Sequence, residues 1–173
     1  MKMIAIRSVA CALSLGAALI TPQLNAQQSS LRAALAKDAG TLSDKFSGLA
    51  RVMAGKYDWK PAPGVRSVAD VFNLIVAENA NLVAVISGSP AGPRPAPVTD
   101  PDKMQEALKT SYANLQKAIN ALSDSDLQAS VKLFGRDMTK QGALMLLIND
   151  QHEHLGQSIA YARSNGVVPP WSK

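Results

Sequence analysis

Apolar residues recur at helical spacing along four stretches of the chain. Within each stretch they lie three, four or seven positions apart, which places them on one face of an α-helix. This pattern predicts helices over residues 29–54, 67–87, 102–122 and 140–164. No run alternates polar and apolar residues convincingly enough to predict a β-strand. Four amphipathic helices without strands predict an all-α fold, a four-helix bundle.

The residues between these stretches predict where the helices begin and end. Ser67 is a candidate N-cap, and Asp70 three positions later completes a pattern similar to a capping box. Residues 88–101 are rich in proline and glycine, so they predict a long connection between the second and third helices. Residues 123–126 interrupt the third helix, and residues 127–139 predict a short ordered loop or ribbon.

The N-terminal segment has the three parts of an export signal. Basic residues come first, residues 8–20 are apolar and rich in alanine and leucine, and the small residue Ala26 ends a candidate cleavage site. The apolar part is too short to span a bilayer comfortably, which argues against a retained anchor. We therefore expect residues 1–26 to be a cleaved signal peptide, residues 27–173 to form the bundle domain, and the mature protein to be periplasmic or secreted.

Composition and charge narrow the function classes. The chain has 173 residues, of which 47% are hydrophobic and 18% charged, as in a single globular domain. Its formal charge of +5 falls to +3 once Lys2 and Arg7 leave with the signal peptide, because 18 basic residues become 16 against 13 acidic ones. A charge this small, without a basic cluster, argues against nucleic-acid binding.

The sequence also argues against thiol chemistry, membrane insertion and three common catalytic or nucleotide-binding motifs. The single cysteine, Cys11, lies in the predicted signal peptide, so the mature chain has no thiol for a disulfide, a nucleophile or a metal. No apolar run of about 18 residues follows the signal peptide, so no stable membrane insertion is expected after cleavage. The chain also lacks a nucleophile elbow, a P-loop and a dinucleotide-binding fingerprint.

The last predicted helix carries both histidines of the chain. Asp150 and His154 are four positions apart and share one side of the helix, the spacing at which two ligands on one helix reach one metal ion. His152 lies on the opposite shoulder, so the two histidines cannot easily share a metal. Histidines in such positions also occur as packed or solvated side chains, and this alternative stays open.

Glu78 and Asn79 interrupt the apolar stripe of the second predicted helix. A buried carboxylate must be paired, protonated or bound to a metal. If the second and fourth helices are neighbours, Glu78 could meet Asp150 and His154, and one histidine with two carboxylates is an acceptable metal set. The alternative is that Glu78 lies at the edge of the stripe and bonds to a neighbouring residue.

Several short runs of the chain resemble segments of DinB-like proteins. The resemblance covers about residues 30–171 and rests on these runs: KYDWKPAPGVRS at 56–67, LFGR at 133–136, EHLGQ at 153–157, YAR at 161–163 and GVVPP at 166–170.

The resemblance implies a four-helix bundle with a divalent metal held by three histidines, one on the second helix and two on the last. The matching positions in this sequence are Leu74, Asp150 and His154, so one of the three histidines is present. Glu78, one turn after Leu74, could replace the missing ligand. The resemblance also implies a homodimer, and relatives with this fold include thiol-dependent S-transferases.

Two functions from different classes follow. The first is a binding or assembly module whose metal site is degenerate or absent, which Leu74 at a ligand position favours. The second is a divalent-metal-dependent hydrolase or transferase that uses Glu78, Asp150 and His154, with zinc, nickel or manganese as the cofactor. Either function is compatible with an exported homodimer that takes a small-molecule ligand.

Overall fold

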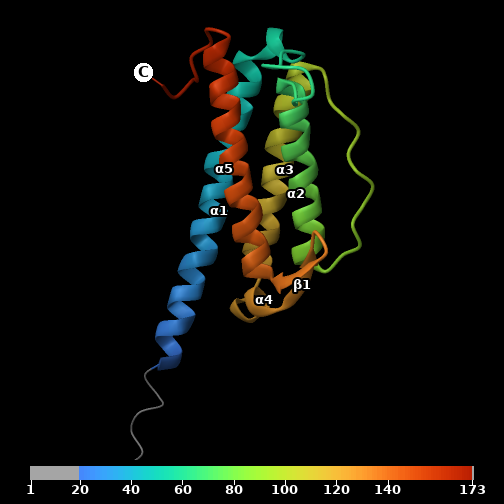
Figure 1. Ribbon diagram of the computed structural model, residues 1–173. Coiled ribbons are helices and arrows are strands. Elements are labelled where there is room, and N and C mark those ends of the chain that lie inside the picture. The colour runs from blue at the N-terminus through green and yellow to red at the C-terminus, as the bar shows by residue number, and fades with distance from the viewer. Residues whose placement is uncertain (1–19, 173) are drawn as a thin grey trace, which may run out of the picture.

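The computed structural model describes residues 20–172 and has the predicted four-helix bundle. The long helices are α1 (Ile20–Val52), α2 (Val68–Ser87), α3 (Pro101–Ala121) and α5 (Lys140–Ser164). α1 and α2 each contact α3 and α5, so the four helices surround one core (Figure 1). A short 3₁₀ turn, η1 (Ala54–Lys56), follows α1. The all-α prediction is confirmed.

The connection between α2 and α3 runs along the outside of the bundle. Residues 88–100 return from the end of α2 to its start without helix or strand, as predicted, so α2 and α3 run in the same direction (Figure 1). Asn73 holds this connection in place, because its side chain donates to the Val98 carbonyl at 2.9 Å and accepts from the Val98 amide at 2.8 Å.

Aromatic side chains join three of the four helices in the core. Phe46 on α1 meets Phe72 on α2 edge to face and stacks on Tyr112 of α3, with ring centroids 6.3 Å apart in both pairs. All three side chains are buried. Burial of such large apolar surfaces is the main stabilising contribution to the bundle.

The start of α2 follows the predicted capping pattern. The Ser67 hydroxyl accepts from the Asp70 amide at 3.2 Å, and the Asp70 carboxylate accepts from the Ser67 amide at 3.0 Å. These bonds lower the pKa of Asp70. The cap satisfies free amide groups of the first turn and so fixes where α2 begins.

The segment between α3 and α5 is more ordered than the sequence indicated. Residues 123–126, expected only to interrupt a helix, cap and begin the short helix α4 (Asp124–Gln128). Two short antiparallel strands follow, β1 (Ser130–Leu133) and β2 (Arg136–Thr139), so the prediction that the chain has no strand is wrong at this ribbon. Each strand is too short for the alternation of polar and apolar residues to stand out.

A two-residue turn joins β1 to β2. Phe134 and Gly135 both have positive φ angles, +50° and +76°, which is typical of a type I′ hairpin turn. This conformation suits glycine but strains a bulky aromatic residue. The Phe134 side chain is also 65% exposed, so the hairpin places an aromatic ring at the protein surface.

The predicted signal peptide lies mostly outside the described residues, which begin at Ile20. From there α1 is already helical, nine residues before the predicted start at residue 29. Export and cleavage after Ala26 stay predictions. Among the described helices, α2 alone is long and apolar enough to cross a membrane, by length and composition only, and one face of it packs in the core of the bundle.

A pair of neighbouring leucines on α5 tests the core. Leu147 is 1% exposed and Leu146 is 40% exposed. We expect Leu147→Ala to lower the free energy of unfolding by about 2–5 kcal/mol, because it leaves a cavity in the core, and Phe72→Ala to do the same. Leu146→Ala should change it by less than about 1 kcal/mol. Urea denaturation followed by circular dichroism measures both, and equal losses for the two leucines would contradict the packing described.

Candidate metal centre

The structure brings Glu78, Asp150 and His154 together between α2 and α5. Each offers one ligand atom, and these atoms all lie within 4.8 Å of one another. All three side chains are partly buried. The structure therefore places Glu78 within reach of the pair on α5, across the interface between the two helices.

The spacing of the α5 pair suits a shared cation better than a hydrogen bond. His154 Nε2 and Asp150 Oδ2 are 3.6 Å apart, which is too long for a hydrogen bond. Two ligands about 2.1 Å from a tetrahedral zinc ion lie roughly 3.4 Å apart. The separation of the two atoms is therefore close to that of two ligands on one metal ion.

A chain of hydrogen bonds orients the His154 ring. His154 Nδ1 lies 2.9 Å from Gln157 Oε1, Gln157 Nε2 donates to the Tyr161 hydroxyl at 2.8 Å, and that hydroxyl donates to the Arg66 carbonyl at 3.2 Å. Because an amide oxygen only accepts, Nδ1 donates this bond, and Nε2 is the ring nitrogen that faces Asp150. Such second partners are typical of histidines that bind metals.

Glu78 is the unusual carboxylate of the group. Its Oε2 atom is buried without a hydrogen-bond partner among the described residues. Burial, followed by the negative charge of Asp150, raises the pKa of Glu78 from 4.5 to about 8, while Arg66 acts in the opposite direction. An unpartnered buried oxygen costs free energy, and a cation bound to it would remove that cost. The donor set, one imidazole nitrogen and two carboxylates, fits a divalent metal ion.

The three residues open into a cavity of about 520 Å³. Leu74 and Leu147 contribute apolar surface to its lining, and Phe134 of the hairpin turn also lines it. The volume lies within the range of small-molecule sites. The other lining residues are Arg66, Arg136 and Leu146.

Residues 40–158 match the DinB superfamily, and this match spans more than half of the chain. The chain belongs to the DinB superfamily. No curated protein matches its sequence. The family membership confirms the resemblance seen in the sequence motifs.

Two solved structures resemble this DinB protein in fold. A DinB-like protein from Bacillus subtilis aligns with a TM-score of 0.65 and one from Bacillus cereus with a TM-score of 0.63. Each is 22% identical in sequence, and each alignment covers 76% of this chain and 91% of the solved one. At this identity the likeness establishes the shared fold.

Leu74 of this DinB protein lies where the resemblance implies a histidine. It lines the cavity beside Glu78, one helical turn earlier on α2. A leucine side chain has no ligand atom, so Glu78 supplies the only α2 donor of the group.

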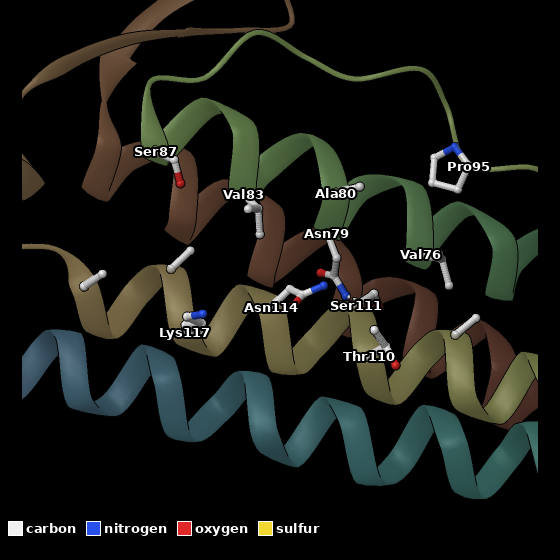
Figure 2. A pocket seen from close by; sticks show the side chains of 13 residues that line it. Val76, Asn79, Ala80, Val83, Ser87, Pro95, Thr110, Ser111, Asn114 and Lys117 are labelled. Atoms are coloured by element: carbon white, nitrogen blue, oxygen red, sulfur yellow. Dashed lines mark hydrogen bonds between the residues drawn. The ribbon is translucent and has the colours of Figure 1, made fainter.

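The two other polar residues singled out in the sequence, His152 and Asn79, lie away from the site. His152 is on the opposite side of α5, 2.8 Å from Asp38 on α1, as its position on the helix indicated. Asn79 turns into the core, where it is 0% exposed. Its amide nitrogen donates to the Ser111 hydroxyl on α3 at 3.0 Å, as the orientation in Figure 2 shows.

Asn79 belongs to a buried network that the sequence did not predict. Its carbonyl oxygen accepts from Gln151 on α5 at 2.8 Å, and the Tyr112 hydroxyl donates to Gln151 at 3.0 Å. Gln151 is 0% exposed and lies among the buried apolar residues of α5. A polar residue there, opposite another in the stripe of α2, is the signal that could have predicted the pair.

A second and larger cavity lies along α2 and α3. Asn79 and Ser111 line it together with small and apolar residues, and its volume is about 680 Å³ (Figure 2). It shares no lining residue with the cavity at Glu78. This larger cavity is therefore separate from the cavity at Glu78.

The raised pKa of Glu78 predicts how pH affects the stability of the metal-free protein. Below about pH 4.5 the carboxyl group is neutral in both states and has no effect. Between pH 4.5 and about 8 only the unfolded chain ionises, so the free energy of unfolding falls as pH rises.

We expect Glu78→Gln to remove this part of the pH dependence and Asp150→Asn to lower the pKa of Glu78. Chemical denaturation in EDTA across pH 4–9 measures the first effect. The carboxyl ¹³C shift of Glu78 measures the second. A Glu78 that titrates near 4.5 in the folded protein would contradict the burial described.

Proposed function

We propose that this DinB protein binds one divalent cation through Glu78, Asp150 and His154 and presents it to a small molecule in the cavity between α2 and α5. The observation that carries the proposal is the convergence of three ligand atoms within 4.8 Å of one another, on residues that line one cavity. The buried Oε2 of Glu78, which has no hydrogen-bond partner among the described residues, supports it, because a bound cation would give this oxygen a partner.

The donor set indicates the cations to test. One nitrogen and two oxygen donors suit zinc, nickel and manganese, since imidazole accepts all three and carboxylates favour the harder ions. A cation held there would supply a Lewis acid that polarises an oxygen atom of the ligand. Among this chain's own residues, Gln157 orients the His154 ring and Leu74 keeps one side of the site apolar.

The class of activity that this arrangement supports is a metal-dependent hydrolase or transferase. The ligand atoms face a cavity rather than a closed cage, as a catalytic metal site requires. The second candidate is a binding module without a metal. It is favoured by Leu74, which removes the nitrogen donor implied on α2, and by a Glu78 that is neutral below about pH 8.

Removal of one histidine tests the metal site against a matched control. We expect purified protein without a histidine tag to bind zinc in calorimetric titration. His154→Ala should weaken this binding by about 10–100-fold or more, because loss of a residue that only hydrogen-bonds to a metal ligand already has an effect of that size. His152→Ala removes the other histidine and should leave the affinity unchanged. If His154→Ala binds zinc as tightly as the wild type, the site assignment is wrong.

A second variant tests the importance of Leu74. The double change Leu74→His with Asp150→His places imidazoles at the positions implied by the family resemblance. We expect it to raise the affinity for zinc or nickel, because borderline cations prefer nitrogen over hard oxygen donors. The same calorimetric titration measures the change. No gain in affinity would show that Leu74 and Asp150 do not occupy the ligand positions.

We propose in addition that the protein is exported to the periplasm or secreted, and that it assembles as a homodimer. The motif at residues 1–26 supports export. A protein of this kind would work in an oxidising compartment, where a mature chain without cysteine is chemically stable.

A further inference from the structure

Two arginines line the cavity that holds the three candidate ligands. Arg66 directly precedes the capped first turn of α2, and Arg136 opens strand β2 after the hairpin turn. Within residues 20–172, neither guanidinium has a carboxylate within 4.0 Å. Both cationic side chains are exposed, so their charge is available to a molecule that enters the cavity.

The balance of charge in the cavity favours an anion. With a divalent cation bound, the cation and the two guanidinium groups outweigh the carboxylates of Glu78 and Asp150 by two charges. Guanidinium groups match the planar oxygens of carboxylates and the oxygens of phosphates with paired hydrogen bonds. Charge lining a concave site also raises the local concentration of a ligand of opposite sign.

An apolar surface lies beside the charged groups. Phe134 is 65% exposed and Leu146 is 40% exposed, and both line the same cavity. Phe134 also lines a neighbouring cavity of about 400 Å³, together with Leu74 and Glu78. The aromatic ring thus stands at the boundary of two adjoining spaces, where it can pack against the apolar part of a ligand.

Besides its exposed ring, the strained backbone at Phe134 also indicates a functional residue. With φ at +50°, this position would be occupied with less strain by asparagine or glycine. Strained residues are found where the surrounding structure uses them for binding or catalysis. A large aromatic side chain that is both strained and exposed stabilises the fold little, which points to a role in ligand contact.

From these positions we infer that the cavity binds a small organic anion. Its oxyanion group, a carboxylate or a phosphate, pairs with Arg66 and Arg136, and its apolar body packs on Phe134 and Leu146. This inference deepens the proposed function, because it names the class of molecule that would meet the cation held by Glu78, Asp150 and His154.

Charged and uncharged versions of one probe test the inference. Calorimetric or NMR titration would compare 2-naphthoate and 2-naphthyl phosphate with the uncharged 2-naphthamide, on protein loaded with zinc and on protein in EDTA. We expect at least one anion to bind about tenfold or more tightly than the amide. Equal affinity for all three probes, or no binding of either anion, would overturn the inference.

Arginine variants identify the groups that hold the anion. Arg66→Gln and Arg136→Gln should each weaken anion binding by about 10–100-fold and leave amide binding unchanged. Arg163→Gln, on the exposed last turn of α5, is the matched control and should bind the anion like the wild type. Unchanged anion affinity in both cavity variants would exclude the assigned role of the arginines.

A change at the hairpin turn separates ligand contact from stability. Phe134→Asn should weaken binding of the naphthyl anions several-fold, because the ring is lost, while the melting temperature stays equal or rises, because an Asn-Gly turn is less strained. A fall in melting temperature together with unchanged binding would show that Phe134 has only a structural role.

Zinc titration of the same variants separates this inference from the proposed function. Arg66→Gln and Arg136→Gln should bind zinc like the wild type. If the wild type does not bind zinc but anion binding in EDTA depends on the arginines, the metal proposal fails and the anion site stands. If zinc binds and the anions do not, the metal site stands and the anion inference fails.

Discussion

A single buried hydrogen bond, from Gln151 on α5 to Asn79 on α2, fixes how these two helices face one another. Both residues are 0% exposed, so leaving the Gln151 amide nitrogen or the Asn79 carbonyl oxygen without its partner would cost about 1–3 kcal/mol. Sliding or rotating either helix would break the bond. Because Glu78 and Asp150 directly precede these two residues, the same register places the two carboxylates together. The candidate metal centre therefore depends on a hydrogen bond in the core beside it.

The site carries two features that oppose stability. Glu78 is a buried carboxylate whose Oε2 has no partner among the described residues, and Phe134 is an aromatic residue in a left-handed conformation. Both line one cavity. Elsewhere the bundle is regular, with a capped α2 and an aromatic core. Departures from good local structure that gather at one place are expected at functional sites, where binding offsets their cost.

Local patterns predicted the parts of this site that lie on one helix. Residues four positions apart lie on the same side of a helix, so the sequence predicted that Asp150 and His154 are neighbours. The same repeat predicted that His152 lies on the other side of the helix. The β1–β2 hairpin was predicted only as a short ordered loop or ribbon, since strands of this length leave little periodic signal. Gln157 was missed because its contact with His154 depends on a ring orientation that tertiary packing selects.

By itself, the sequence determined the helices, their caps and the family to which the chain belongs, because apolar spacing and short motifs are local properties. It also determined that one histidine and two carboxylates were available as ligands. Only the tertiary structure decided that they meet, since Glu78 and Asp150 are far apart in the chain and their contact requires α2 and α5 to be neighbours in one register. It likewise decided that Glu78 is buried and that Arg66 and Arg136 line its cavity, because burial and electrostatic surroundings arise from packing between elements.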